Sequence, residues 1–289
     1  MRILWLLLSF TFYIHATNIL VMNSNGKIDR YQTMENTFSK AIAQKVQHVD
    51  IAFMKEDDIK EYLYDIYPDI VYAIGTKAYQ YAKKYVPEKK IYFSSIVNYK
   101  RFSMGKNRFG VSNELHPGMQ LTLIKALLPK IKSIGIVYSR YTQSIYDGFK
   151  TEAKKLGITV IGQKITKTDH YNFEKFKNID AFLMLADPVM LADEKKVKVH
   201  FSHFKKLHIP VIAYHPLYLK YGAVLIIAVD VETIGRQVAS MIESDMHGHS
   251  YQTMQMPIGT KVIFNQGLAK RMGLHYDKSA LGIVNKVIK

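Results

Sequence analysis

Short runs of apolar and β-branched residues alternate along the chain with longer segments in which apolar residues recur every three or four positions. The short runs are typical of buried strands, and the longer segments are typical of amphipathic helices. In the first part of the sequence, the predicted strands cover 19–22, 49–54, 70–74, 91–94 and 108–112. The predicted helices between them cover 31–46, 57–66 and 77–85. Such alternation favours a parallel sheet with helices on both faces.

A second series of the same kind begins after Pro117, a residue that suits the first turn of a helix. Its predicted strands cover 134–138, 158–161, 180–185, 210–214 and 223–229. Its predicted helices cover 118–128, 146–156, 188–207 and 231–246. The two series share their layout but few residues. The sequence therefore predicts an α/β protein with two Rossmann-like lobes, each built on a parallel sheet.

Polar residues follow the predicted strands at the ends where parallel sheets bind ligands. Ligands of such sheets lie beyond the carboxyl ends of the strands, close to helix N-termini and loop amide groups. We therefore predict one cleft for a small ligand between the lobes. The candidate ligand-binding residues of the first lobe are Ser24, Asn25, Gly75, Thr76 and Ser95. Those of the second lobe are Tyr138, Thr142, Asp187, Tyr214 and Asp230.

Each of these residues also has a purely structural interpretation. Ser, Thr, Asn and Asp commonly form turns and cap helices. Asp187 and Asp230 each directly precede a predicted helix, so both fit the role of a helix cap as well as that of a ligand contact.

The composition is that of a globular protein with a basic surface. Of 289 residues, 48% are apolar and 22% are charged, which excludes a disordered chain. The formal charge of +16 raises the possibility of nucleic-acid or anionic-membrane binding. However, lysines are scattered over the whole length, and no basic block is interleaved with stacking aromatic residues. We expect a solvated basic surface and no nucleic-acid partner.

The first sixteen residues have the features of a secretory signal. Arg2 provides a positive start, residues 3–14 are rich in Leu, Ile and Phe, and Ala16 is a small residue that can precede a cleavage site. The apolar run is too short to span a bilayer. The alternative is a buried first strand. We expect cleavage near residue 16 and a monomeric, periplasmic or otherwise secreted protein with no membrane span.

The chain lacks the common signatures of enzymes and metal sites. It has no cysteine, which excludes disulfides, thiol catalysis, cysteine zinc sites and a lipid-anchored cysteine. It has no Gly-x-Ser-x-Gly, Walker or His-Glu-x-x-His motif. The histidine pairs 200/203 and 247/249 have no carboxylate at a matching spacing, so solvated histidines are the simpler interpretation. We predict no catalytic residue, no metal and no cofactor.

Four stretches of the chain carry recognisable motifs in a defined order. They are a Gly-Thr turn before a helix at 73–78, the segment 109–138, the segment 209–230 and the terminal strand and helix at 261–274. Together, from about residue 17 to the end, they resemble the ABC-transporter substrate-binding protein family that includes tryptophan- and tyrosine-binding members. Two stretches depart from the family pattern. Residues 226–228 are apolar where many members have Ser-Tyr-Gly, and Ser95 stands where many have an acidic residue.

This resemblance implies the type I periplasmic-binding fold, in which two lobes are joined by three crossings of the chain. We expect the crossings near 112–116, 230–233 and 257–260. The first lobe then comprises 17–113 and 231–257, and the second comprises 114–230 and 258–289.

The resemblance also implies an exported solute-binding protein of an ABC import system. Its partners are then a small polar ligand and a membrane permease. We hypothesise an amino-acid-like ligand, an aromatic amino acid being one option. Its carboxylate is expected to meet backbone N–H groups and hydroxyls, and its ammonium an acidic side chain. The hydroxyls are those of Ser24, Thr76 and Ser95, the acids are Asp187 or Asp230, and the aromatic contacts are Tyr138, Tyr141 and Tyr214.

Two alternatives keep a ligand-binding fold but change the role. The protein could signal ligand binding to a membrane kinase or cyclase instead of feeding a permease. A cytoplasmic ligand-responsive regulator is the other alternative, although the sequence leaves no room for a helix-turn-helix before Asn18.

Overall fold

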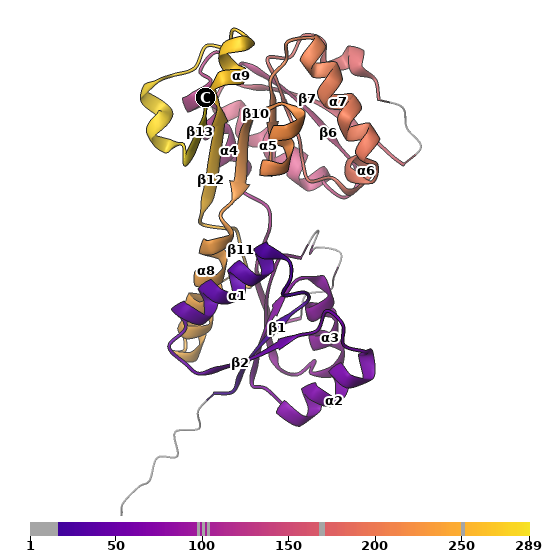
Figure 1. Ribbon diagram of the computed structural model, residues 1–289, viewed down its shortest axis with the longest axis vertical. Coiled ribbons are helices and arrows are strands. Elements are labelled where there is room, and N and C mark those ends of the chain that lie inside the picture. The colour runs from indigo at the N-terminus through magenta and orange to yellow at the C-terminus, as the bar shows by residue number, and fades with distance from the viewer. Residues whose placement is uncertain (1–16, 97–98, 100–101, 103–104, 168–170, 250–251) are drawn as a thin grey trace, which may run out of the picture.

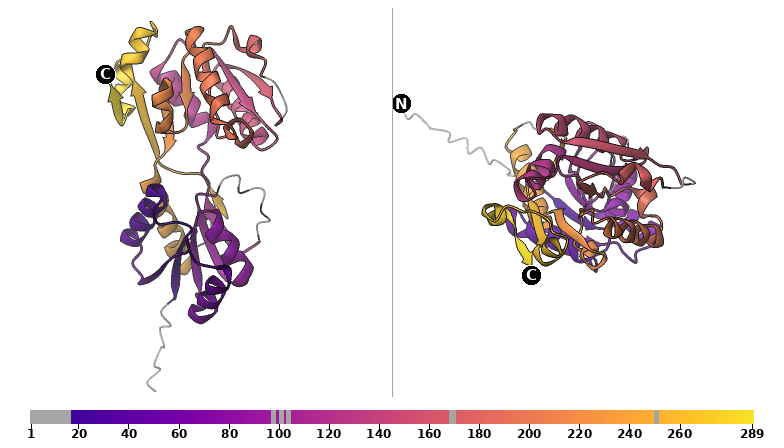
Figure 2. Two further views of the ribbon diagram at one scale, coloured as in Figure 1. Left: turned by 45° about the vertical axis from the view of Figure 1, so that its right-hand side comes forward. Right: turned by 90° about the horizontal axis from the view of Figure 1, so that it is seen from above.

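The computed structural model describes residues 17–96, 99, 102, 105–167, 171–249 and 252–289, so the predicted signal segment 1–16 lies outside the described residues. Two separate sheets, each covered by helices, occupy opposite ends of the long axis of the molecule (Figure 1). Narrow connections join the two halves (Figure 2). The predicted fold class, two Rossmann-like α/β lobes, is confirmed.

The first sheet has the strand order β11-β5-β4-β3-β1-β2, and all its neighbouring strands are parallel. Its strands are β1 (Ile19–Asn23), β2 (Val46–Asp50), β3 (Ile70–Ile74), β4 (Lys90–Ser94), β5 (Arg108–Val111) and β11 (Met254–Gln255). Both faces of this sheet are covered by helices, which is why every residue of β1 and β3 is buried. One face packs against α1 (Asp29–Ala41) and α8 (Val231–Met246), and the other packs against α2 (Glu56–Ile66) and α3 (Thr76–Tyr85).

The second sheet has the order β13-β12-β10-β9-β8-β6-β7. Its strands are β6 (Ser133–Tyr138), β7 (Thr159–Lys164), β8 (Ala181–Leu183), β9 (Val211–Ala213), β10 (Ala223–Val229), β12 (Thr260–Asn265) and β13 (Lys286–Ile288). Only the β10–β12 pair is antiparallel among the described strands. The helices on one face are α4 (Pro117–Leu127), α5 (Gln143–Lys155) and α9 (Gln266–Arg271). Those on the other face are α6 (Pro188–Leu191) and α7 (Glu194–Lys206), together with the 3-10 turns η2 (Phe173–Phe176) and η3 (Pro216–Tyr221). A further 3-10 turn, η4 (Ser279–Ile283), precedes β13.

The chain crosses between the two sheets three times. It leaves the first sheet after β5, returns between β10 and α8, and leaves again between β11 and β12 (Figures 1 and 2). We propose the lobe boundaries that follow from the sequence, namely 17–113 with 231–257 and 114–230 with 258–289.

Several predicted elements have wrong bounds. The strand expected at 49–54 is β2 at Val46–Asp50, and the preceding helix ends at Ala41 instead of residue 46. The sequence pattern was misleading because β2 is an edge strand whose side chains are largely exposed. It ends at Asp50, whose carboxylate accepts hydrogen bonds from the backbone N–H groups of Gly26 and Ala52 and so turns the chain.

In the second lobe, the helix expected at 188–207 is two helices. Asp193 separates α6 from α7 because its carboxylate accepts a hydrogen bond from the backbone N–H of Lys195 and caps the second helix. The strand expected at 158–161 is Thr159–Lys164, and the short strands β11 and β13 were not predicted.

His200 of α7 is a buried core residue, 2% exposed, and not the solvated histidine that the sequence suggested. Its Nδ1 lies 2.6 Å from the carbonyl oxygen of Lys196, so Nδ1 carries the proton and donates. Its Nε2 is buried without a hydrogen-bond partner among the described residues. The rings of Tyr171 and His200 pack edge to face. Burial lowers the pKa of His200 below 6.5, partly opposed by the bond to the Lys196 carbonyl. The folded protein therefore favours the neutral imidazole.

We expect this burial to make stability depend on pH. As the pH falls below about 6.5, the unfolded chain takes up a proton at this histidine before the folded protein does. The unfolded state then binds more protons, so the free energy of unfolding falls with decreasing pH. The substitution His200→Phe should make this fall shallower in urea denaturation between pH 7.5 and 5.5.

His247→Phe is the matched control for this prediction. His247 makes the same kind of bond, from Nδ1 to the carbonyl oxygen four residues earlier, but it is exposed. If both variants keep the wild-type pH dependence, burial of His200 does not contribute to it.

Candidate functional site

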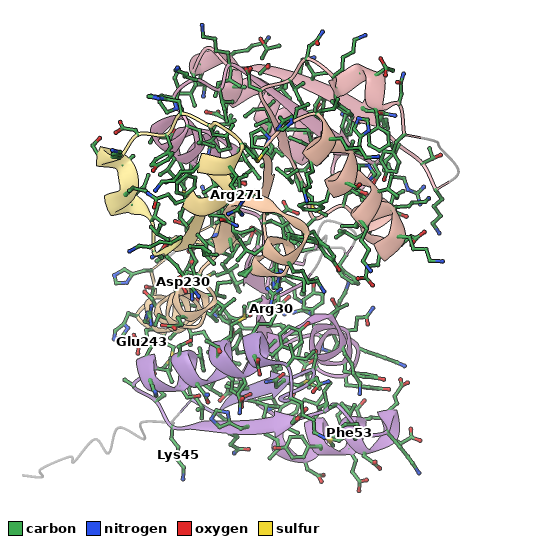
Figure 3. All side chains as sticks on the ribbon, turned by 45° about the horizontal axis from the view of Figure 1, so that its top comes forward. Arg30, Lys45, Phe53, Asp230, Glu243 and Arg271 are labelled. Atoms are coloured by element: carbon green, nitrogen blue, oxygen red, sulfur yellow. The ribbon has the colours of Figure 1, made fainter. Side chains whose placement is uncertain are left out.

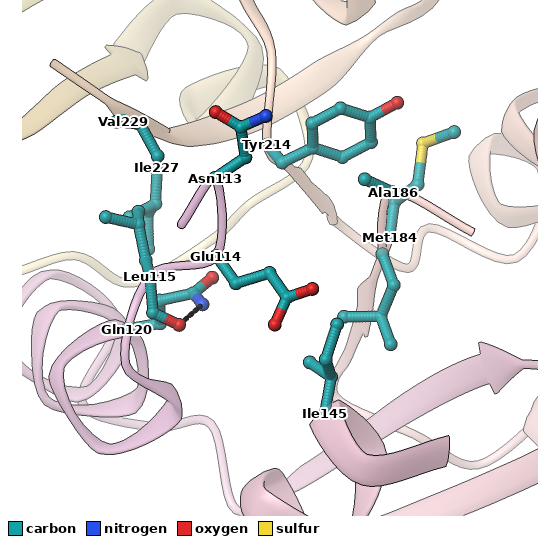
Figure 4. A pocket seen from close by; sticks show the side chains of 11 residues that line it. Asn113, Glu114, Leu115, Gln120, Ile145, Met184, Ala186, Tyr214, Ile227 and Val229 are labelled. Carbon is teal, nitrogen blue, oxygen red and sulfur yellow. Dashed lines mark hydrogen bonds between the residues drawn. The ribbon is translucent and has the colours of Figure 1, made fainter. Parts of the chain in front are cut away.

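A pocket with about 490 Å³ of free space, part of it open to solvent, lies at the carboxyl ends of the second sheet's strands (Figure 4). Its walls come from the crossing after β5, from α4 and α5, from the loops after β8 and β9, and from β10. The lining residues are Asn113, Glu114, Leu115, Gln120, Ile145, Met184, Leu185, Ala186, Tyr214, Ile227 and Val229.

The pocket combines an apolar wall with a few polar groups. Figure 4 shows the carboxylate of Glu114 directed into the middle of the space. The side chain of Gln120 donates a hydrogen bond to the carbonyl oxygen of Leu115, 3.1 Å away, which fixes the start of the second lobe. An apolar wall with few convergent polar groups is typical of sites for small organic ligands.

Arg30, in the first turn of α1, lies between the two lobes (Figure 3). One terminal nitrogen of its guanidinium donates to the hydroxyl of Ser95 at 3.3 Å and to the side-chain oxygen of Asn113 at 3.2 Å. Its Nε is buried and has no hydrogen-bond partner among the described residues. Desolvation by burial lowers the pKa of Arg30, opposed by the nearby phenol groups of Tyr31 and Tyr214.

Two residues that follow β9 in the second lobe lie near Arg30. Burial raises the pKa of Tyr214, as does the contact of its hydroxyl with that of Tyr218 at 2.9 Å, and the charge of Arg30 opposes this rise. Burial lowers the pKa of His215, and the charge of Arg30 lowers it further. Arg30 of the first lobe therefore acts electrostatically on the second lobe.

Sequence reasoning missed Arg30. Arg30 directly precedes the helix predicted at 31–46, and one arginine does not stand out in a chain with 40 Lys and Arg residues. Glu114 was also missed, since it lies in a crossing and not after a predicted strand of the second lobe.

The first-lobe candidates lie at strand ends, where they also stabilise helices and turns. The hydroxyl of Ser24 accepts a hydrogen bond at 2.9 Å from the backbone N–H of Ala78, in the first turn of α3. Gly75 has a φ of +89°, and a Cβ there would lie 2.7 Å from the Ser24 hydroxyl, so only glycine fits without strain. Thr76 begins α3, and the side chain of Asn25 accepts from the backbone N–H of Lys27 in a turn.

In the second lobe, the structure brings Thr142 and Asp187 together. Asp187 is fully buried, and its carboxylate accepts four hydrogen bonds from its own lobe. The donors are the backbone N–H groups of Ser139, Val189 and Met190 and the hydroxyl of Thr142. This carboxylate therefore joins the ends of β6 and β8 and caps α6.

The remaining two second-lobe candidates also have structural contacts. The ring of Tyr138 stacks on Tyr146, with ring centroids 3.9 Å apart. Asp230 caps α8 through the backbone N–H of Glu232, and its own N–H donates to the carbonyl of Gly259 at a crossing. Of the ten candidates, Ser95 contacts Arg30 and Tyr214 lines the pocket. Ligand contact by any of the ten stays a prediction.

The described residues contain no group of three or more His, Asp or Glu side chains placed to hold a metal ion. Over the same part of the chain, we find no helix with both the length and the apolar character needed to span a bilayer.

Comparison with solved structures finds the same fold at low sequence identity. A domain from Streptococcus pneumonia in complex with L-Trp is 19% identical, with a TM-score of 0.59, covering 94% of this chain and 100% of that one. A conserved domain protein from Vibrio cholerae is 19% identical, with a TM-score of 0.60 and coverage of 94% and 99%. A substrate-binding protein with adhesive properties from Clostridium difficile is 18% identical, with a TM-score of 0.71 and coverage of 94% and 99%.

A search of curated proteins found no match. A family model described as "ABC transporter substrate binding protein" matches residues 42–288, which is most of the chain and contains the strands of both sheets except β1. This family consists of binding proteins rather than enzymes, and its description implies a small-molecule ligand and a membrane permease. The chain belongs to the ABC transporter substrate-binding protein family.

Proposed function

We propose that this protein is exported, captures a small polar ligand between its lobes, and delivers it to the permease of an ABC import system. The observation that carries the proposal is the pocket beside the crossing after β5, whose walls come from this crossing and the second lobe. Arg30 of the first lobe donates a hydrogen bond to Asn113, one of the residues that line the pocket. The signal-like segment 1–16 supports export.

The chemistry of the pocket favours an amino acid, an aromatic one being an option. Its apolar wall suits an apolar side chain, and the ring of Tyr214 offers an aromatic surface. We propose Glu114 as the partner of the ammonium group. Its carboxylate is directed into the pocket, whereas neither Asp187 nor Asp230 is among the residues that line it. The L-Trp complex of the Streptococcus pneumonia domain supports the same class of ligand.

Closure of the two lobes supplies the mechanism of capture. A ligand stabilises the closed arrangement only as far as it gains contacts there that the open arrangement lacks. Ser95 belongs to the first lobe and Tyr214 to the second, so a ligand that contacts both is held best when the lobes approach each other.

Ligand binding should raise the melting temperature of the purified protein. We expect titration with the twenty amino acids, nucleosides and small anions to identify a ligand that adds about 2.7 kcal/mol of stability at 100 times its Kd. Calorimetry of the same solute then gives the affinity.

The variant Ala186→Trp tests whether this pocket is the site. Ala186 is an exposed residue of the pocket wall, so an indole there fills the pocket without disturbing the core. Ala186→Trp should abolish the rise in melting temperature that the ligand causes. The control variant Ala192→Trp should keep this rise, because Ala192 is an exposed residue after α6 that does not line the pocket. If no solute raises the melting temperature of the wild type, the proposal is contradicted. If a ligand raises the melting temperature of Ala186→Trp as much as that of the wild type, the site lies elsewhere.

A further inference from the structure

Arg30 is a half-buried cation with unused hydrogen-bonding capacity. A guanidinium has five N–H donors, and its two hydrogen bonds both start from one terminal nitrogen. Its buried Nε has no acceptor among the described residues, and no carboxylate forms an ion pair with it there. A charge removed from water without a counter-charge is costly. This arginine is therefore poorly explained as a purely structural residue.

The neighbours of Arg30 hold its guanidinium in place without neutralising it. Asn113 and Ser95 both offer neutral oxygens. Ser95 is 3% exposed and adopts a left-handed backbone conformation with a φ of +59°, which is uncommon for a residue with a side chain. Its hydroxyl also contacts the sulfur of Met34, at 3.2 Å. These contacts fix one end of the guanidinium and leave Nε for another partner.

The position of Arg30 connects it with the pocket. Asn113, which accepts its hydrogen bond, lines the pocket, and so does Tyr214, which is near enough for the arginine charge to affect its pKa. Glu114 is the next residue along the chain after Asn113. Arg30 therefore lies beside the pocket that Glu114 lines and is connected to it through Asn113.

We infer that Arg30 binds the carboxylate of the ligand and makes an anionic group a requirement for binding. This deepens the proposed function and rests on it. A guanidinium presents its N–H groups in one plane, which matches the two oxygens of a carboxylate. Arg30 and Glu114 then bind opposite poles of a zwitterion.

The test compares L-amino acids with their carboxamides, which keep the side chain and the ammonium but lose the anionic group. Both series are titrated by calorimetry against the wild type, Arg30→Gln, Arg30→Lys and Arg236→Gln. Arg236 is an exposed residue of α8 in the same lobe, so its variant removes the same charge away from the site.

For an amino acid that binds the wild type, we expect Arg30→Gln to weaken affinity by about 10- to 150-fold. Arg30→Lys should give an intermediate loss, because lysine keeps the charge but not the planar edge. Arg236→Gln should bind like the wild type. The carboxamide should bind the wild type weakly, and the substitution Arg30→Gln should reduce the affinity for the carboxamide little further.

Two results overturn the inference while the proposed function stands. One is a carboxamide that binds the wild type as tightly as its amino acid, a measurement that needs no variant to fold. The other is an Arg30→Gln protein, folded by circular dichroism, that binds like Arg236→Gln. If the wild type binds neither an amino acid nor a carboxamide, the proposed amino-acid ligand fails, and the carboxylate site fails with it.

Discussion

The substitution Asp187→Ala is expected to lower the free energy of unfolding by roughly 3–5 kcal/mol. The reason is that one buried carboxylate accepts four hydrogen bonds, three from backbone N–H groups and one from Thr142. An alanine leaves these donors without an acceptor in a region that water does not reach, and an unsatisfied buried donor costs about 1–3 kcal/mol. Urea denaturation followed by circular dichroism measures the loss.

Asp193→Ala is the control for this experiment. Asp193 also caps a helix of the second lobe, but with a single hydrogen bond, to the backbone N–H of Lys195. Its loss should cost about 1 kcal/mol. If Asp187→Ala is instead nearly as stable as the wild type but has lost its ligand, Asp187 is a ligand contact, as the sequence allowed, and Glu114 loses its proposed role.

The second large effect is expected where α1 and α8 meet. A Cβ on Gly235 would lie 2.2 Å from the hydroxyl oxygen of Thr37, 2.4 Å from the carbonyl oxygen of Met34 and 2.8 Å from the backbone nitrogen of Phe38. Two of these atoms belong to the backbone of α1, so the helices must move apart to admit a methyl group. We expect Gly235→Ala to lower the free energy of unfolding by about 2–3 kcal/mol, as overpacking of a core does.

This result would be opposite in sign to the intrinsic preference of a helix, because alanine is more favourable than glycine there by about 1 kcal/mol. Gly148→Ala provides the comparison. Gly148 lies within α5, where the nearest atom to a new Cβ is a ring carbon of Pro117 at 3.1 Å. It should be neutral or slightly stabilising. Equal effects at both positions would mean that α1 and α8 do not pack as closely as described.

Much of the fold could be predicted because its central strands are buried on both faces. Residues of β3 and β10 form continuous apolar runs, and such runs are readable without knowledge of their neighbours. The edge strand β2 was misplaced, by three residues at its start and four at its end, for the opposite reason. Its exposed side chains carry no apolar signal, whereas the apolar residues that follow it do. The two-residue strand β11 is defined only by its pairing with β5, which lies far away in the sequence.

The candidate site was harder to predict than the fold. A sequence shows which polar residues follow strands, but not which of them already have partners in their own lobe. Ser24 and Asp187 have such partners. Arg30 is distinguished by the opposite property, a buried donor without an acceptor, and that property depends on the packing of α1 against Ser95 and Asn113.

The order of elements along the chain has a consequence for biosynthesis. Helix α8 and strand β11 complete the first sheet's half of the molecule, yet the ribosome makes them after every strand of the second sheet except β12 and β13. Until then, Met34 and Phe38 of α1 lack the helix that covers them. A nascent chain that stops before residue 231 therefore exposes an apolar helix face, so neither half can be completed strictly ahead of the other. Late completion of this kind keeps the polypeptide from reaching its compact state early, which is compatible with the export that we propose for it.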